Sequence, residues 1–435
     1  MREMKDSGVE WIGEIPASWS IIRTKFLFNV LSGATPESTK AENWDGEIRW
    51  ITPADYKTND VYISCGRRNL SQVGFESCST NMIPAGSIIF SKRAPIGSVA
   101  INSVDLCTNQ GCLSCVSKGE GLVKYYYYVM SVSTEQYELL GSGTTFKEIS
   151  AQNFSNFNLP CPQYEDQVAI SKYLDIKCSQ VDTLITNVQA QIEKLKAYKQ
   201  SLITEIVTKG LDPTVPMKDS GVEWIGTIPE HWGTAKLQYC AQIRSGITLG
   251  KKYPKGTKMI ERPYLRVANV QSGGVLLDNV KTVEVSADDD LQYRLSVGEV
   301  LMTEGGDRDK LGRGCVWEGQ IAPCLHQNHI FALQTNDLLD PQFLAYMTVS
   351  DVGRVYFDIT AIKTTNLACT NSSKVLAFRF PLPKMDEQIE LAAYLDKRCA
   401  QIDRLISIKQ TKIEKLEQYK RSLIYEFVTG KKEVC

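Results

Sequence analysis

The sequence predicts an α+β fold: two α+β domains in a pseudo-twofold arrangement, joined by two long antiparallel helices that form a coiled coil. Three observations lead to this prediction. A short motif occurs twice in the 435 residues, a long segment with a helical pattern occurs twice, and a β-rich region that differs between the halves follows each short motif. Two copies are too few for a solenoid and suit two modules on a common frame.

The two repeats are clear at the level of single residues. Residues 4–19 read MKDSGVEWIGEIPASW and residues 217–232 read MKDSGVEWIGTIPEHW, so that 13 of 16 positions agree. Residues 166–209 align without gaps on residues 387–430, with 22 identities in 44 positions. The tryptophans of the short motif are interpreted as packing residues, because a segment shared by both halves cannot distinguish two different targets.

The long repeats carry apolar residues in alternating steps of four and three, which is the pattern of a coiled-coil seam. The helices are expected to run antiparallel, because each leads the chain toward the short motif of the other half. Lys199 and Lys420 interrupt the seam and are expected to extend their ammonium groups into water in preference to forming a specific buried salt bridge. Gly210 and Gly430 suit C-caps. The seam comprises Leu174, Cys178, Val181, Ile185, Val188, Ile192, Leu195, Leu202 and Ile206 in the first copy, and Leu395, Cys399, Ile402, Ile406, Ile413, Leu416, Leu423 and Phe427 in the second.

Composition limits the class of protein. Hydrophobic residues make up 43% of the chain, which favours folded domains over disorder, and no run of 18 apolar residues or signal core occurs. A cytoplasmic protein is therefore expected, with its 13 cysteines as free thiols. Cys107, Cys112 and Cys115 form the only close cluster and are interpreted as buried strand residues, because a zinc site needs a fourth ligand. No metal site is predicted.

The formal charge of −1 does not by itself announce nucleic-acid binding, so that any positive surface must be local. The two differing regions, of about residues 20–160 and 233–381, contain loops that combine glycine with basic, amide and hydroxyl groups. Arg and Lys pair with guanine edges, Asn and Gln with adenine, and Ser or Thr with phosphates. The DNA-binding candidates in these loops are Lys92, Arg93, Asn109, Gln110, Thr144, Thr145, Lys147, Arg308, Lys310, Arg313, Gln327, Asn328, Lys363, Thr364 and Thr365.

Searches of the sequence for catalytic motifs find none. There is no G-x-x-x-x-G-K-[ST] loop, no G-x-G-x-x-G motif after a strand, and no Asn-Pro-Pro-aromatic or Asp-Pro-Pro-aromatic tetrapeptide of amino-methyltransferases. His326 and His329 are interpreted as parts of a polar loop in preference to a catalytic or metal-binding pair. No catalytic residue is therefore predicted.

The combined pattern resembles the specificity subunit family of type I restriction–modification systems. The motif SGVEWIGxIPxxW occurs twice, and each differing region ends in Pro-x-Pro followed by Asp166-Gln167 or Glu387-Gln388. Tyr-Leu-Asp, Ile-Glu-Lys-Leu and Tyr-Lys-x-Ser-Leu-Ile then follow in both halves, so that the resemblance covers essentially the whole chain.

The resemblance implies a sequence-specific DNA-recognition subunit without chemistry of its own. It implies two target recognition domains, each reading one half of a bipartite site in double-stranded DNA, two methyltransferase subunits docked on the helical frame, and two restriction subunits. S-adenosylmethionine, ATP and Mg²⁺ are then cofactors of the partners and not of this chain. The expected division is residues 1–162 and 213–383 for the recognition domains, and 163–212 and 384–435 for the helices.

The helical frame has two expected roles. About 33 residues from Leu174 to Ile206 span roughly 50 Å at 1.5 Å each, more than one DNA turn of about 34 Å, so that the helices are expected to set the spacing between half-sites. Outward residues that are identical in both copies are the candidates for subunit docking: Tyr198, Glu205, Tyr419 and Glu426. Two alternatives stay open at this point: a coiled-coil adaptor that binds proteins only, and a stand-alone DNA methyltransferase or nuclease.

Overall fold

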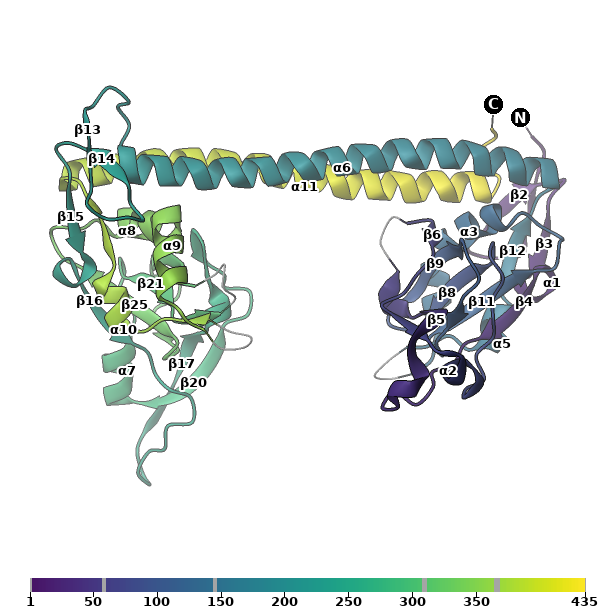
Figure 1. The fold of residues 1–435 in the computed structure, drawn as a ribbon, viewed down its shortest axis with the longest axis horizontal. Helices are drawn as coiled ribbons and strands as arrows, with labels where there is room; N and C mark the ends of the chain where they lie inside the picture. Colours follow the sequence, from purple (N-terminus) through teal and green to yellow (C-terminus); the bar gives the residue numbers. More distant parts are fainter. Residues whose placement is uncertain (1, 57–59, 144–146, 307–310, 364–367, 435) are drawn as a thin grey trace. The chain divides into compact units, whose positions relative to one another are not determined.

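A computed structural model describes the chain except for residues 1, 57–59, 144–146, 307–310, 364–367 and 435. The chain divides into two compact units, which are described separately: unit 1 comprises residues 1–189 and 411–435, and unit 2 comprises residues 190–410. Each unit contains one sheet-rich domain and part of both long helices (Figure 1). The predicted α+β class is confirmed.

Unit 1 is built on two mixed sheets. The larger sheet has the order β4-β11-β8-β9-β6, and the smaller one has the order β10-β5-β7, in which β10 runs parallel to β5. Helix α3 (Val123–Val132) contributes fully buried Tyr125 and Val129 to the core, which it shares with Phe90. The strands are β4 (Phe28–Ser32), β5 (Trp44–Ile51), β6 (Tyr62–Ile63), β7 (Arg68–Leu70), β8 (Ile88–Lys92), β9 (Ile96–Asn102), β10 (Cys107–Thr108) and β11 (Cys112–Ser117).

Unit 2 repeats this topology without a counterpart of β6, although its sequence differs. Its larger sheet has the order β16-β25-β21-β23 and its smaller sheet the order β24-β17-β20, again with a parallel pair, β24 and β17. Helix α8 (Pro341–Val349) takes the place of α3, with Phe343 and Met347 fully buried. The strands are β16 (Ala241–Ser245), β17 (Met259–Leu265), β20 (Lys281–Ser286), β21 (Val300–Thr303), β23 (Gly314–Val316), β24 (Leu325–His326) and β25 (Ile330–Thr335).

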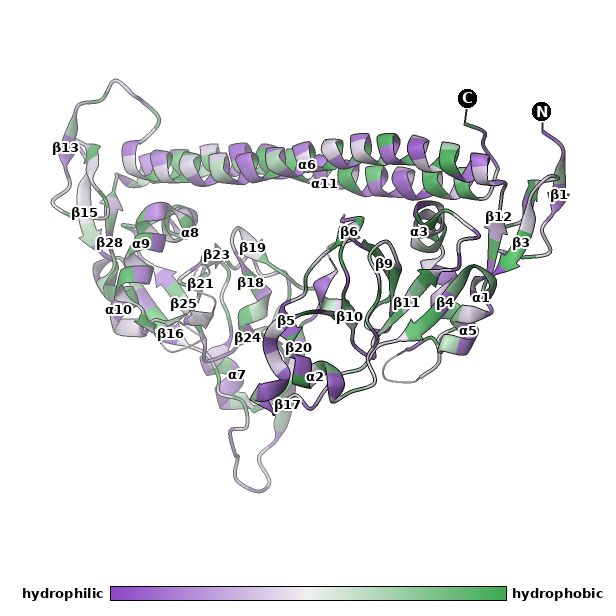
Figure 2. Ribbon diagram, turned by 45° about the vertical axis from the view of Figure 1, so that its right-hand side comes forward, coloured by the Kyte–Doolittle hydropathy of each residue, from purple (hydrophilic) through white to green (hydrophobic). Residues whose placement is uncertain are grey.

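The long helices α6 (Tyr164–Lys209) and α11 (Met385–Val428) pair antiparallel in both units, as predicted. In unit 1 the Tyr173 and Phe427 rings pack with centroids 4.5 Å apart, and in unit 2 Lys409 Nζ donates to Gln191 Oε1 at 2.6 Å. Leu174 and Leu395 are fully buried, and apolar and polar stretches alternate along both helices (Figure 2). The apolar seam is therefore the contact surface between the helices.

The preferred interpretation of the two seam lysines is wrong in one respect. Lys420 Nζ lies 2.6 Å from Asp182 Oδ1 in unit 1, and Lys199 Nζ lies 2.7 Å from Asp403 Oδ2 in unit 2. Each lysine thus forms a specific ion pair with the opposite helix, whereas the expectation was an ammonium group bound only by water. The pairs are not buried, since the lysine side chains keep about a quarter of their surface exposed: 22% for Lys420 and 26% for Lys199.

The shared repeats hold the domains to the helices by the same contacts in both units. Gln167 is buried at the start of α6, where its amide accepts from Leu122 N at 2.8 Å and donates to Pro162 O at 3.0 Å. Gln388 does the same at the start of α11 with Asp340 N and Pro383 O, both at 2.9 Å. The glutamine of the Asp-Gln and Glu-Gln motif is therefore a link between helix and domain.

A tyrosine–aspartate hydrogen bond adds a second link about two turns further along each long helix. Tyr128 Oη donates to Asp175 at 2.5 Å, and Tyr346 Oη donates to Asp396 at 2.6 Å. Burial raises the pKa of both tyrosines, so that each hydroxyl keeps its proton and remains a donor. Because these aspartates belong to the repeated Tyr-Leu-Asp motif, the repeat places the same helix of each domain, α3 or α8, against the frame.

The short motif closes each unit by packing on the end of a helix. Its hairpin is β1 (Met4–Asp6) with β2 (Glu14–Pro16) in unit 1, and β13 (Met217–Asp219) with β14 (Thr227–Pro229) in unit 2. Gly430 follows α11 with φ +71° and lies so close to Pro16 and Trp19 that an added Cβ would be 2.4 Å from Pro16 Cδ. The return of the second helix to the first motif is thus confirmed, and the C-cap needs glycine at this position.

Candidate nucleic-acid interface

In unit 1, three predicted loops meet at Lys92, the last residue of β8. Its backbone N–H donates to Gly111 O at 2.9 Å, next to the amides of Asn109 and Gln110. Its carbonyl accepts from Ile149 N at 3.1 Å, which brings in the loop before α5 (Ala151–Ser155). Ladder contacts of the main chain therefore join segments that lie about 20 and 60 residues apart in the sequence.

Unit 2 builds the same junction at Glu304. Its backbone N–H donates to His329 O at 2.9 Å, and its carbonyl accepts from Thr370 N at 2.8 Å. The following strand β22 (Gly305–Gly306) pairs with β27 (Ala368–Cys369), as Arg93 pairs with Glu148 in unit 1. We call these two equivalent junctions the loop clusters. They show that the differing regions place their polar loops at the same points of one scaffold.

The second loop of each cluster, between β10 and β11 or between β24 and β25, approaches a neighbouring strand closely. Asn109 N donates to Ile51 O, and the equivalent Gln327 N donates to Leu265 O, both at 2.9 Å. A Cβ on Gly33 would lie 2.0 Å from Thr108 O, and one on Gly246 would lie 2.1 Å from His326 O. Glycine is required at both positions because any side chain would push the loop away.

The charges of the two clusters are arranged differently. In unit 1 Lys92 Nζ lies 2.8 Å from Glu148 Oε1, and Arg93 Nη1 lies 3.4 Å from Glu148 Oε2, so that two cations share one carboxylate. In unit 2 the central residue is acidic, and Glu304 Oε2 lies 2.6 Å from His329 Nδ1. The clusters therefore present unlike hydrogen-bonding surfaces on like backbones.

The predicted DNA-binding residues fall into three groups. Lys92, Arg93, Asn109, Gln110, Lys147, Arg313, Gln327 and Asn328 lie in or beside the loop clusters, at half-buried or exposed positions. The structure gives the backbone of Lys363 in strand β26 (Ile362–Lys363), which pairs with β27, but not its side chain. Thr144, Thr145, Arg308, Lys310, Thr364 and Thr365 lie outside the described residues.

Besides Lys92 and Arg93, two more candidate side chains are bonded within unit 1. Asn109 Oδ1 accepts from Gly111 N at 2.8 Å, which fixes its own turn, and Gln110 Oε1 is bonded to the Thr35 hydroxyl. Asn109 therefore shapes the loop, and its amide nitrogen is the group left for a base edge. The sequence did not reveal Glu148 and Glu304 as cluster members, because their role depends on contacts between distant segments.

His326 and His329 do not form a pair with one function. His329 is exposed and contacts Glu304, which agrees with a polar loop. His326 is fully buried, and neither ring nitrogen has a hydrogen-bond partner among the described residues, so that the polar-loop interpretation is wrong for this residue. Burial lowers the pKa of His326 to about 3, which keeps its ring neutral.

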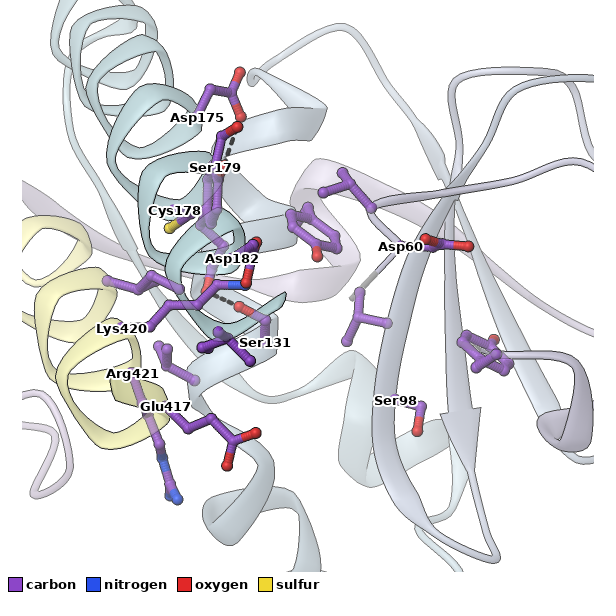
Figure 3. Close-up of a pocket in the computed structure, with 18 of the residues that line it drawn as sticks. Asp60, Ser98, Ser131, Asp175, Cys178, Ser179, Asp182, Glu417, Lys420 and Arg421 are labelled. Atoms are coloured by element: carbon purple, nitrogen blue, oxygen red, sulfur yellow. Dashed lines mark hydrogen bonds and ion pairs between the residues drawn. The ribbon is translucent and has the colours of Figure 1, made fainter. Parts of the chain in front are cut away.

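A groove in unit 1 runs between the domain and the helices, with a volume of about 950 Å³. Asp175, Cys178 and Asp182 of α6 and Lys420 of α11 line one wall, opposite Ser98 of β9 (Figure 3). A smaller cavity in unit 2 is lined by the repeat equivalents of these four residues: Lys199, Asp396, Cys399 and Asp403. The helices supply the same four residues to both spaces, so that this wall belongs to the shared frame, whereas the domains supply different residues. No cluster of metal-ligating side chains occurs among the described residues, and no described helix meets the length and apolarity that a membrane span requires.

Comparisons with known proteins agree with this arrangement. The family model "Type I restriction modification DNA specificity domain" matches residues 16–196. The type I restriction enzyme MjaIX specificity subunit of Methanocaldococcus jannaschii is 27% identical over 345 residues, covering 77% of this chain and 76% of that protein. The EcoKI specificity subunit of Escherichia coli is 20% identical, covering 96% and 90%. A solved chain from a study of complex assembly and conformational transition of the type I R-M system shares the fold, with a TM-score of 0.69, 16% identity, and coverage of 95% and 98%.

One scaffold that occurs twice and carries unlike polar loops defines a protein of sequence recognition. The chain is similar over most of its length to the specificity subunits of type I restriction–modification systems. These relatives are named specificity subunits, which agrees with the expectation of a recognition subunit without chemistry of its own. The resemblance drawn from the sequence is therefore confirmed, and neither the adaptor nor the stand-alone enzyme is favoured.

The burial of His326 predicts a pH dependence of stability. Its folded pKa of about 3 lies below the ordinary value of 6.5, so that the unfolded chain binds the extra proton first as the pH falls. This stabilising contribution is complete above pH 6.5 and is lost below it, by about 2 kcal/mol between pH 7.5 and 5. The free energy of unfolding of the parent chain, measured by thermal unfolding from pH 7.5 to 5, should show this loss. His326→Leu and His326→Gln should lack it, and an equal pH slope in all three proteins would contradict the prediction.

Proposed function

We propose that each α+β domain reads one half of a bipartite site in double-stranded DNA, with residues 1–162 and 213–383 as the two target recognition domains. One observation carries the proposal: the loop clusters have equivalent backbones but different side chains. Lys92 with Glu148 in one cluster corresponds to Glu304 with His329 in the other. Direct readout needs this combination, because the backbone sets the position and the side chains select the base.

We assign base reading to the loop clusters and phosphate contacts to their basic rims. Lys92, Arg93, Asn109, Gln110 and Lys147 serve the first half-site. Thr144 and Thr145 belong to the same loops of the first domain. The second half-site is served by Arg308, Lys310, Arg313, Gln327, Asn328, Lys363, Thr364 and Thr365.

The complete assembly in this proposal contains two methyltransferase subunits and two restriction subunits. S-adenosylmethionine, ATP and Mg²⁺ are bound by these partners, and the assembly works in the cytoplasm, where the DNA is accessible. The helical pair, residues 163–212 with 384–435, docks the methyltransferase subunits and sets the spacing between the half-sites. Identical docking positions in the two repeats suit two copies of one partner.

The docking surface is the flank of the helices that bears Tyr198 and Tyr419, which are 48% and 54% exposed. The ion pair of Asp182 with Lys420 puts Leu184 at the level of Tyr419, and that of Lys199 with Asp403 puts Leu405 at the level of Tyr198. All four residues directly precede a seam position, so that each unit presents one exposed leucine–tyrosine pair. Glu205 and Glu426 lie on the same flank, where Glu426 contacts Lys432 at 2.7 Å.

Exchange of one domain tests the main proposal. A chain in which residues 20–160 are replaced by the matching region of another family member should recognise a site altered in one half only, because each domain carries its own loop cluster. Genome-wide mapping of methylated adenines, with the parent and exchanged genes, gives both sites. Alteration of both halves, or of neither, would show that the domains do not read separate half-sites.

Removal of the docking side chains should weaken subunit association. The double variant Tyr198→Ala with Tyr419→Ala loses one exposed aromatic ring per unit, and we expect methyltransferase-subunit binding to fall at least tenfold, since aromatic anchors dominate interfaces. Tyr239→Ala is the control, because Tyr239 is 65% exposed but lies in a short 3-10 helix outside α6 and α11. Circular dichroism checks the helical content, and unchanged association with intact helices would exclude this flank.

Lengthening the helices tests their role as a spacer. One heptad inserted between Val188 and Ile192, and another between Lys409 and Ile413, adds roughly 10 Å at 1.5 Å per residue. That length corresponds to about three base pairs and about 100° of rotation along the duplex. The lengthened variant should no longer methylate the site with the original spacer. A series of substrates with different spacers is the assay. Full activity on the original spacing, with both insertions helical, would leave the helices as a docking platform only.

A further inference from the structure

A basic segment of unit 2 lies outside the loop clusters and outside every predicted DNA-binding loop. Residues 249–258, which we call the basic arm, read LGKKYPKGTK and connect β16 to β17. In Figure 1 the connection that leads into β17 extends well beyond the sheets of unit 2. The whole chain has a formal charge of −1, so that four lysines within eight residues form a local concentration of positive charge.

The root of the basic arm is fixed to the domain. Lys251 Nζ donates to Asp289 Oδ1 at 2.8 Å, and Tyr253 Oη donates to Asp289 Oδ2 at 2.7 Å. Asp289 is buried in the first turn of α7 (Ala287–Tyr293), where the helix N-terminus also favours its negative charge. The carboxylate neutralises Lys251 and anchors the arm, so that Lys251 is a structural residue.

The other three lysines are available to a partner. Lys252, Lys255 and Lys258 are exposed, and within the described part of the chain none of them forms an ion pair. The tip is a turn in which Thr257 N donates to Pro254 O at 3.2 Å, with Gly256 at φ +88°. This turn holds Lys255 at the end of the arm. Glu261 and Glu284 face each other on the β17–β20 ribbon that follows the arm.

The arm leaves the domain beside the second loop cluster. Asn328 N donates to Ile247 O at 3.0 Å, and the Ser245 hydroxyl donates to Asn328 O, also at 3.0 Å. The equivalent segment of unit 1, residues 33–43, contains one lysine, and Lys40 Nζ is paired with Glu37 at 3.2 Å. Among the described residues, unit 2 therefore has unpaired lysines next to its Gln327–Asn328 loop, whereas the equivalent segment of unit 1 has one lysine, which is paired.

We propose that Lys252, Lys255 and Lys258 bind the phosphate backbone of the duplex beside the second half-site. The inference rests on the proposed function, because it takes the Gln327–Asn328 loop to read bases. An anionic backbone is the partner that the arm fits, because its free groups are ammonium ions, which bind phosphates as point charges. The arm thus adds affinity on one side of the bipartite site without changing the sequence that is read.

The test uses the chain assembled with its methyltransferase subunits. In the variant Lys252→Gln, Lys255→Gln, Lys258→Gln, three phosphate contacts are lost, and the slope of log K against log salt should become shallower by roughly 2 to 3 for a duplex. Affinities for the target and for an unrelated duplex should fall by the same factor at each salt concentration. The variant with arginine at all three positions should keep the slope of the parent, and Lys40→Gln in unit 1 is the matched control.

Each result has one consequence. An unchanged slope, or a loss confined to the target duplex, would overturn the phosphate assignment. A loss of methyltransferase-subunit association with an unchanged slope would assign the arm to an acidic protein surface and would overturn it as well. Failure of the parent assembly to prefer any target would instead refute the proposed function, whereas a parent with normal preference and an unaffected variant refutes only the inference about the arm.

Discussion

The antiparallel contact of α6 with α11 is the interaction on which each unit depends. Neither helix can leave its apolar seam in water, and the buried leucines at positions 174 and 395 show where the seam meets the domain cores. The Asp182–Lys420 and Lys199–Asp403 ion pairs then fix the register of the helices. Because surface ion pairs contribute little free energy, the seam provides the stability and the ion pairs select one alignment.

From this contact the position of each domain follows by short hydrogen bonds. Gln167 and Gln388 bind backbone groups of the domain, and the Tyr128–Asp175 and Tyr346–Asp396 bonds follow about two turns further along. Buried amides that lost their partners would cost about 1–3 kcal/mol each, so that these links resist rearrangement. Two domains with different sequences are thereby presented to their helices in the same way, which leaves the loops as the part that can differ.

Under the proposed function, the loop clusters explain how a chain with balanced charge can bind a polyanionic partner. Glu148 compensates Lys92 and Arg93 within the cluster, and Asp289 compensates Lys251 at the root of the basic arm. Positive charge is thus arranged locally and held by carboxylates that fix its position. A large uniform excess of cations would raise affinity for every sequence equally, whereas a few positioned cations beside amide groups preserve discrimination.

The sequence by itself determined the repeated architecture, the seam, the glycine caps and the family resemblance, because repeats, heptads and caps are local patterns that survive in the order of residues. It also indicated which loops are polar. The tertiary structure alone decided that these loops meet at Lys92 and at Glu304, since ladder hydrogen bonds join segments far apart in the chain. It likewise decided that His326 is buried, that the seam lysines are paired, and that the sheets of both differing regions share one strand order apart from β6. Burial and pairing depend on which distant segments come together, and no local pattern records that choice.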